Sequence, residues 1–447
     1  MAAGAPTRPT GEEIEHCDVL VIGGGPAGST AAALLSRAGR GVVLAERDHF
    51  PRFHIGESLL PANVPLLDEL GVRATLDRAG TIVKHGARVV SADGRTGTTV
   101  RFSEGLLPGP ATTYQVERAQ FDELLLRNAS RLGADVREGT EVREVAHRDG
   151  IWRATLAREG CPPRQLEACH VVDASGRDSL LARAWQSRRM LERHRRIAVF
   201  SHYRGVLLDP GIDAGNTVLV LFADAWFWLI PISREVTSVG VVFDSAAWQK
   251  AGLAPEAALE RAIRNAPEVS RRFAAAERIA PIRATSDYSY RSDIIERDGA
   301  VLVGDAFAFL DPVFSSGVWL GMRAGAAVAR VLDRCLDRPA RARALLARHA
   351  RREHRVHRHF WRLIEGFYGP GFRDLLMQPQ ARLGIAAAVR TALAGTVSHN
   401  PRFRLRLALF LGLTRLQGRF GLSPPIPLNA SLAEPAPLGE DTVALSA

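Results

Sequence analysis

The sequence predicts an α/β fold with two sheets and a C-terminal helical region. Three observations carry this prediction. An apolar run near the N-terminus ends in glycines and opens a helical pattern, the residues from about 195 to 245 alternate as strands do, and a helical pattern extends from about 316 to 420. With 447 residues, of which 46% are hydrophobic, the chain is long enough for two or three units with buried cores.

The first unit begins with a βαβ arrangement. CDVLVI (17–22) is a short apolar strand, a helical pattern follows at about 26–38, and GVVLAE (41–46) forms the next strand. A helix at about 118–132 and the apolar strand in AVLVGDA (300–306) extend the same unit. The predicted parts are a discontinuous first domain at 14–190 and 281–340, a mostly antiparallel β-sheet domain at 191–280, a helical region at 341–422 and flexible tails at 1–13 and 423–447.

The glycine spacing in VIGGGPAGSTAA indicates a nucleotide site. Gly23, Gly25 and Gly28 follow a strand and open a helix. Gly23 permits a tight turn, Gly25 lets the backbone approach a pyrophosphate, and Gly28 allows close helix–strand packing. The helix N-terminus offers free N–H groups to phosphate, and Glu46 ends the next strand, where a carboxylate can bind a ribose hydroxyl pair. A purely structural glycine turn is the alternative, but these features together favour a Rossmann-like nucleotide site.

Two later segments favour FAD over NAD as this nucleotide. VVDASGRDS (171–179) and VLVGDAFAFLDP (301–312) are strands that end in short polar motifs, and the second places Asp305 where it can bind ribityl hydroxyls. Both resemble motifs of flavoprotein monooxygenases of the p-hydroxybenzoate hydroxylase type, as does QVERAQFDELLLRNA (115–129). The motifs and this resemblance imply the FAD-binding residues Gly23, Gly25, Pro26, Ala27, Gly28, Glu46, Arg47, Arg118, Gly304, Asp305, Pro312, Gly317 and Val318.

A second resemblance is more specific. In AWFWLIPI (225–232), a strand would point Trp226, Trp228 and Ile230 to one face, where they can be ordinary core. However, Trp-x-Trp-x-Ile-Pro is the signature of flavin-dependent halogenases. The chain resembles the branch of that family that acts on phenols and pyrroles from about residue 16 to 420. Other matching segments are FPRFHIGESLLPA, VKHG, DPVFSSGV, FWRLIEGFYGPGFRDLL and AVRTALAGTV.

The resemblance implies the chemistry of an FADH2-dependent halogenase. Reduced flavin and oxygen give a C4a-hydroperoxide, halide attacks it to form hypohalous acid, and the paired indoles of Trp226 and Trp228 hold the organic substrate away. Chloride or bromide is the co-substrate. The substrate is an electron-rich phenol or pyrrole, either free or tethered to an acyl- or peptidyl-carrier protein, in secondary-metabolite biosynthesis.

The resemblance also gives a reason for one unusual residue. Of 58 basic residues, only Lys84 and Lys250 are lysine. The lysine of VKHG is the position where the family uses an amine on hypohalous acid, either by hydrogen bonding or by forming a haloamine. A buried lysine can lose its proton, whereas arginine cannot. Lys84, Trp226 and Trp228 are therefore the expected catalytic residues, with chance placement of a rare lysine as the alternative.

The expected halide site is Ser315, Ser316 and Gly317, at the start of a helix. Trp319 departs from the family pattern here and is expected to crowd the start of that helix. Gly317, Gly321 and Gly325 form a face suited to close packing. No base for the ring proton is assigned. Glu57 and Ser58 match a family segment along the flavin or serve the structure alone.

Composition excludes several other classes. The net charge of +10 comes from arginines spread along the chain, without a nucleic-acid-binding module. The four cysteines lack a CxxC pair, so no zinc site is expected, and a solvated basic face is favoured over a metal site at His354 and His357. No signal peptide or membrane span is expected, which favours the cytoplasm.

A separate flavin reductase is the expected source of FADH2, because no second GxGxxG is present for a nicotinamide cofactor. Two other functions remain open on the same scaffold. One is a flavin-dependent aromatic monooxygenase or oxidase, and the other is a non-catalytic flavin-binding partner. Product formation that requires halide distinguishes the halogenase from both.

Overall fold

The computed structural model describes residues 14–191, 195–286, 289–309, 311–378 and 384–428. Its first sheet has the strand order β19-β20-β10-β1-β2-β7, and the β8–β9 hairpin extends it by antiparallel pairing of β9 with β10. The pairs from β20 to β7 are parallel. The strands are β1 (Glu15–Ile22), β2 (Val42–Ala45), β7 (Asp135–Arg137), β8 (Thr140–Arg148), β9 (Ile151–Arg158), β10 (Arg164–Asp173), β19 (Glu296–Arg297) and β20 (Ala300–Leu302).

Helices pack on this sheet because its central strands are apolar on both faces. They are α1 (Pro26–Arg37), α4 (Arg118–Arg131) and α9 (Gly317–Asp337), with short α2 (Val64–Leu70), α3 (Arg73–Arg78) and α5 (Leu180–Ala184) nearby. The small-residue face of α9 lies on α1: a Cβ added to Gly325 would come within 2.3 Å of the Ala27 carbonyl oxygen. The expected close packing is confirmed at Gly321 and Gly325 but is wrong at Gly317, where an added Cβ would meet nothing within 4 Å. The Rossmann-like fold is confirmed.

The second sheet has the order β16-β12-β15-β14-β13-β4-β5, with β17 also paired to β12. All of its pairs are antiparallel except β13 with β4, which is parallel. The strands are β4 (Gly86–Ser91), β5 (Gly97–Arg101), β12 (Arg196–Arg204), β13 (Thr217–Leu221), β14 (Ala225–Pro231), β15 (Val236–Asp244), β16 (Glu277–Arg278) and β17 (Arg283–Ser286). β4, β5 and β17 thus join this sheet from outside the range 191–280 that the sequence predicts for it.

The two faces of the second sheet pack against different helices. One face carries Phe227 and Leu229 and is covered by α6 (Ser245–Ala251), α7 (Pro255–Arg264) and α8 (Pro267–Arg272). The opposite face carries Trp226 and Trp228 and packs toward α9 and the C-terminal helices. Smaller sheets join the parts: β3 (Ile82–Lys84) with β6 (Thr113–Gln115), and β11 (Arg188–Met190), β18 (Tyr290–Ser292) and β21 (Ala308–Phe309).

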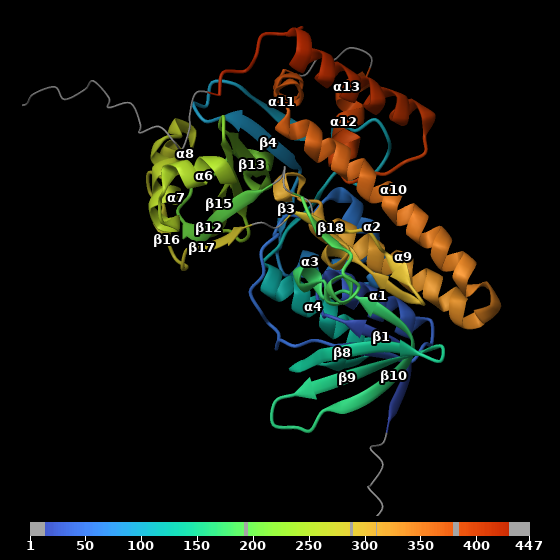
Figure 1. Ribbon diagram of the computed structural model, residues 1–447. Coiled ribbons are helices and arrows are strands. Elements are labelled where there is room, and N and C mark those ends of the chain that lie inside the picture. Colours follow the sequence, from blue (N-terminus) through green and yellow to red (C-terminus); the bar gives the residue numbers. More distant parts are fainter. Residues whose placement is uncertain (1–13, 192–194, 287–288, 310, 379–383, 429–447) are drawn as a thin grey trace, which may run out of the picture.

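The C-terminal region is helical, as predicted. It contains α10 (Ala342–Tyr368), α11 (Pro370–Met377), α12 (Ile385–Leu393) and α13 (Pro401–Phe420). α11, α12 and α13 lie together at one end of the molecule, and α10 runs from them along its side toward α9 (Figure 1). His357 is buried against Phe307, with ring centroids 4.7 Å apart, so the solvated face expected at this position is wrong. No helix in the described ranges has the length and apolar character to cross a membrane.

Candidate active site

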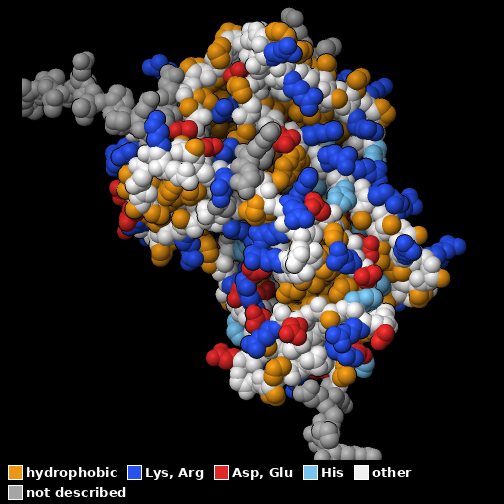
Figure 2. All heavy atoms as spheres, viewed as in Figure 1, with side chains coloured by type: hydrophobic (Ala, Val, Ile, Leu, Met, Phe, Trp, Pro, Cys, Tyr) orange, Lys and Arg blue, Asp and Glu red, His pale blue; other side chains and the backbone are white. Residues whose placement is uncertain are grey.

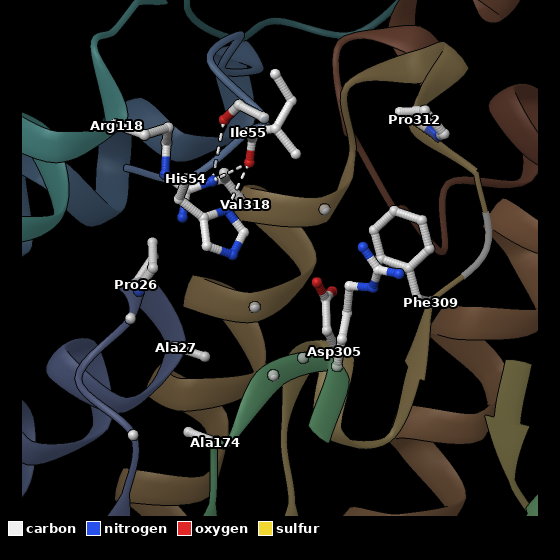
Figure 3. A pocket seen from close by; sticks show the side chains of 18 of the residues that line it. Pro26, Ala27, His54, Ile55, Arg118, Ala174, Asp305, Phe309, Pro312 and Val318 are labelled. Atoms are coloured by element: carbon white, nitrogen blue, oxygen red, sulfur yellow. Dashed lines mark hydrogen bonds between the residues drawn. The ribbon is translucent and has the colours of Figure 1, made fainter. Parts of the chain in front are cut away.

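A cavity of about 820 Å³ lies between the two sheets. Its walls include residues at or just after the ends of four parallel strands, where α/β sheets bind ligands: Ile22, Ala45, Ala174 and Val303. Every FAD-binding residue expected from the sequence lines this cavity except Gly28. Figure 3 shows part of this wall, with Pro26 and Ala27 on one element and Asp305, Pro312 and Val318 on others.

The glycine loop has the backbone that its sequence predicts. Gly23 has a φ of +99°, and a Cβ on Gly28 would lie 1.9 Å from the Gly23 carbonyl oxygen. Gly28 is therefore a packing position, which explains its absence from the cavity wall. A Cβ on Gly25 would meet nothing closer than Arg52 Nη2 at 3.6 Å, so the backbone is open to the cavity at that point.

The acidic residue after β2 holds the glycine loop as well as facing the cavity. Glu46 is buried and accepts hydrogen bonds from the backbone N–H of Gly24 at 2.6 Å and of Asp48 at 2.9 Å. Its neighbour Arg47 forms an exposed ion pair with Asp178 at 2.7 Å across the cavity rim. Glu46 thus fixes the loop shape in addition to the ribose role that the sequence predicts for it.

Arg118 and Asp305 carry opposite charges on this cavity. Arg118 is buried, pairs with Asp122 at 2.7 Å and donates to the Ile55 carbonyl oxygen at 2.7 Å, which fixes its guanidinium (Figure 3). Burial raises the pKa of Asp305 to about 6, although the positive charge of Arg118 opposes that rise. A carboxyl group that titrates near neutral pH can donate or accept hydrogen bonds with hydroxyl groups.

His54 also faces this cavity, and the sequence did not single it out. Its Nδ1 donates to the Ile55 carbonyl oxygen at 2.7 Å, and burial lowers its pKa to about 4. The ring is therefore neutral at physiological pH, and its Nε2 is left as an acceptor. Its place in the segment FPRFHIGES is the only signal for it in the sequence.

The two indoles line the large cavity from β14. Trp226 and Trp228 are both buried, with ring centroids 6.0 Å apart. Space for Trp228 exists only because its cross-strand neighbour is Gly240, where a Cβ would lie 2.2 Å from the indole ring. In the sequence, the lone glycine within the strand pattern TSVGVVFD is the signal that indicates this close approach of a neighbouring group.

A hydrogen-bonded relay holds Trp226 from the other side. Its Nε1 donates to the Tyr368 hydroxyl at 3.0 Å, and that hydroxyl donates to Asp311 Oδ2 at 2.7 Å. Asp311 Oδ1 also accepts from the Val313 backbone N–H, which shapes the turn before the expected halide site. Burial raises the pKa of Asp311 to about 6. The relay connects the indole to this turn.

The expected halide site lies on the cavity wall at the start of α9. The backbone of Ser315 is left-handed with a φ of +54° and that of Ser316 is right-handed, an alternation that can direct successive N–H groups toward one point. The Ser315 N–H donates to the Pro312 carbonyl oxygen at 2.9 Å, which leaves the N–H groups of Ser316 and Gly317 for an anion. No side chain caps the first turn of α9. Trp319 does not line either cavity among the described residues; it packs on Phe360 at 5.2 Å, so the expected crowding is wrong.

Lys84 lies in a second, much smaller cavity of about 40 Å³. Its side chain is 2% exposed, and Nζ donates to Ser58 Oγ at 2.8 Å and to the Leu59 carbonyl oxygen at 3.3 Å. Burial lowers its pKa from 10.5 to about 7. The two cavities are neighbours because they share four lining residues, Thr217, Leu219, Val313 and Ser315.

Glu57 and Ser58 line the large cavity, and Ser58 also contacts the amine of Lys84 in the small one. Ser58 Oγ contacts both Lys84 Nζ and, at 3.1 Å, Thr217 Oγ1. Glu57 is buried on the large cavity, where one carboxylate oxygen accepts from His202 Nε2 at 2.8 Å and the other has no partner among the described residues. Ser58 thus orients the amine, and Glu57 presents an unpaired oxygen within the cavity wall.

Comparison with known proteins identifies the family. The FAD binding domain family matches residues 16–362. A 1H-pyrrole-2-carbonyl-[peptidyl-carrier protein] brominase from Pseudoalteromonas luteoviolacea is 35% identical over 329 residues, which cover 73% of this chain and 79% of that one. The corresponding chlorinase from Pseudomonas fluorescens is 34% identical over 67% of this chain and 72% of that one. The chain belongs to the flavin-dependent halogenases.

A solved structure agrees with this assignment. The flavin-dependent brominase Bmp2 superposes on the halogenase with a TM-score of 0.81 and 29% identity, covering 90% of this chain and 99% of that one. The prediction of a flavin-dependent halogenase is confirmed. The monooxygenase and the non-catalytic partner are set aside.

The large cavity fits FAD. The first turn of α1 faces it without a side-chain cap, so its backbone N–H groups are available for a pyrophosphate beside the open backbone of Gly25. Glu46 directly follows β2 and Asp305 lies in a 3₁₀ turn after β20, and both carboxylates line the cavity, where they suit ribose and ribityl hydroxyls. No cluster of histidine, cysteine, aspartate and glutamate that could hold a metal ion occurs among the described residues of the halogenase.

Proposed function

We propose that this halogenase makes hypohalous acid in the large cavity and uses it beside Lys84 in the small one. The observation that supports this most is that the buried, titratable amine of Lys84 lies in a small cavity that shares lining residues with the FAD-sized cavity. Bound reduced FAD and oxygen would supply the two-electron oxidant for chloride or bromide. The N–H groups of Ser316 and Gly317 would hold the halide beside Ser315, whose own N–H donates to the Pro312 carbonyl oxygen at 2.9 Å. Trp226 and Trp228 would keep an aromatic substrate out of the large cavity.

The hypohalous acid would pass between the residues that line both cavities, and Lys84 would then act on it. With a pKa of about 7, both protonation states exist near neutral pH. The ammonium form can donate a hydrogen bond to hypohalous acid. The neutral amine can form an N–halogen bond as water leaves, and then pass the halogen to the ring as the ring loses a proton.

The proposed substrate is an electron-rich acyl aromatic such as a pyrrole-2-carbonyl group, held as a thioester on a peptidyl-carrier protein. Support comes from the brominase and chlorinase relatives, whose names state that substrate. The small cavity is largely apolar, with Phe102, Phe314 and Phe367 among its lining residues, which suits a flat ring. A separate flavin reductase is proposed as the source of FADH2, and the proposed location is the cytoplasm.

Replacing each lysine in turn tests this function. The purified protein is incubated with FAD, NADH, a flavin reductase, oxygen, chloride or bromide, and free or carrier-bound pyrroles and phenols. Mass spectrometry is expected to detect halogenated product for the wild type and for Lys250→Ala, which alters the exposed lysine on α6. Lys84→Ala and Lys84→Arg are expected to lose at least about a hundredfold in rate, with FAD binding retained. Hydroxylated product that does not require halide contradicts the proposal.

A further inference from the structure

The outer face of α13 is apolar in its centre and basic along its edges. Four exposed side chains form its centre, with exposed fractions from 42% to 71%: Leu405, Leu409, Leu416 and Phe420. Their spacing places them on one side of the helix over about 22 Å. The buried residues Phe403, Leu407 and Phe410 lie on the opposite side. We call these four side chains the α13 stripe.

The charged residues of α13 itself are all positive. α13 contains arginine at positions 402, 404, 406, 415 and 419 and no acidic residue. Four of them, Arg402, Arg404, Arg415 and Arg419, are exposed and form no ion pair with any described residue. The face therefore combines a strip for apolar contact with uncompensated charge on its edges.

A second helix extends this charge. His359 of α10 packs on Phe403 at the start of α13, with ring centroids 6.4 Å apart. Exposed Arg355, Arg358 and Arg362 lie on α10 in the same region, together with one exposed acidic residue, Glu365. In Figure 2, arginine side chains gather along the side of the molecule that Figure 1 assigns to α10.

The stripe lies one helix layer from the Lys84 cavity. Leu376 of α11 and Leu393 of α12 form part of the cavity wall. α13 packs directly on α11, where Phe372 and Phe410 have ring centroids 5.0 Å apart and Gln417 Nε2 donates to Asp374 at 3.0 Å. Packed helix axes lie about 8–10 Å apart. A partner bound on the stripe is thus close enough to deliver a ring on a flexible arm.

We infer that the α13 stripe is the docking surface for the acidic carrier protein that presents the substrate. This inference rests on the proposed function and adds the place and chemistry of the contact. An acidic helix with an apolar centre complements the stripe and its arginines. A second copy of this chain does not, because α13 against α13 would oppose arginine to arginine.

Two variants of the intact halogenase test the surface. Arg402→Glu/Arg415→Glu/Arg419→Glu reverses the edge charge, and Leu409→Ser/Leu416→Ser removes the apolar centre. The control is Arg148→Glu/Arg158→Glu on the exposed ends of β8 and β9, at the opposite end of the molecule (Figure 1). All these side chains are exposed, so thermal unfolding is expected to change little.

The first measurement is binding of a fluorescently labelled peptidyl-carrier protein that carries pyrrole-2-carbonyl as its thioester. Both stripe variants are expected to weaken Kd, and to raise KM for this substrate, by more than about tenfold at 0.15 M salt. The control variant is expected to match the wild type. Turnover of a short pyrrole-2-carbonyl thioester without the carrier protein is expected to be unchanged in all variants.

Three results overturn the inference. The first is unchanged carrier binding in both stripe variants, and the second is stripe variants that lose binding to phosphatidylserine vesicles but keep carrier binding. The third is a wild-type dimer that the leucine variant dissociates. Failure of the proposed substrate is a different result, because it leaves both pyrrole thioesters unhalogenated by the wild type. Carrier binding, which requires no chemistry, still tests the α13 stripe in that case.

Discussion

Lys84 is a residue whose burial opposes folding. The residue is 2% exposed and its amine is held by Ser58 and Leu59, and burial is the cause of its lowered pKa, with no carboxylate contributing. Burying an amine without an opposite charge destabilises its protonated form. A side chain of this kind is retained for chemistry, which agrees with its place beside the large cavity.

The protonation of Lys84 predicts a pH-dependent stability. Its pKa is about 7 in the folded protein and 10.5 in the unfolded chain. Between these values the unfolded chain binds more protons, so the free energy of unfolding rises with pH, by at most about 1.4 kcal/mol per unit from this group. Lys84→Met is expected to be more stable than the wild type at pH 7, by about 1–3 kcal/mol.

Urea unfolding of the two proteins at pH 7 and pH 9 measures this. The stability advantage of Lys84→Met is expected to shrink by about 2 kcal/mol at the higher pH, because removing the proton that the unfolded lysine carries costs less free energy as the pH approaches 10.5. A constant difference between the two proteins contradicts the lowered pKa. Comparison within one pH cancels the titration of all other groups.

At the scale of single elements, β15 sets the position of the indole wall. Gly240→Ala would place a Cβ 2.2 Å from the Trp228 ring and 2.6 Å from the Phe200 Cβ, so the indole must move. Overpacking of this kind destabilises by about 1–3 kcal/mol. The variant is expected to yield less halogenated product and more hydrogen peroxide for each NADH consumed, measured by mass spectrometry and a peroxidase assay.

Gly418→Ala on α13 is the matched control for that substitution. A Cβ there meets nothing within 4 Å, and the backbone is helical. It is expected to leave product yield unchanged and to stabilise the protein by up to about 1 kcal/mol. If Gly240→Ala also keeps the wild-type ratio of product to peroxide, the close packing of Trp228 is not needed to keep substrate and oxidant apart.

At the scale of the whole molecule, the FAD cavity lies between the two sheets, so bound FAD is expected to stabilise both sheets. At a concentration of 100 times Kd the gain is about 2.7 kcal/mol, visible as a higher Tm. Gly25→Val is expected to remove this gain while leaving the Tm without FAD near that of the wild type, because only Arg52 lies within 4 Å of the new Cβ.

Gly28→Val gives the contrasting result. Its Cβ would lie 1.9 Å from the Gly23 carbonyl oxygen, so the protein is expected to lose stability even without FAD. If Gly25→Val still shows the full rise in Tm with FAD, the backbone there does not face the pyrophosphate. Differential scanning fluorimetry of the three proteins, with and without FAD, makes the comparison.

The sequence predicted what local patterns determine. The βαβ start, the glycine loop and the tryptophan strand each lie within a short segment, so spacing alone places their side chains. It could not place Trp319, whose direction depends on Phe360 of α10, nor the link from Ser58 to Lys84 and Thr217, which joins three distant segments. It also missed β4 and β5 as part of the second sheet, because that pairing is parallel and far apart in the chain.

The parallel pair of β4 and β13 has a consequence for protein engineering. β4 begins two residues after Lys84, and β13 begins with Thr217. The amine and the cavity wall beside it therefore come from opposite sides of the exposed Asp149–Gly150 turn. Cutting the gene at that turn would give two fragments, neither of which contains a complete second sheet. Formation of halogenated product would then require the two fragments to reassemble. A compound that keeps the fragments apart could be detected because no new carbon–halogen bond forms.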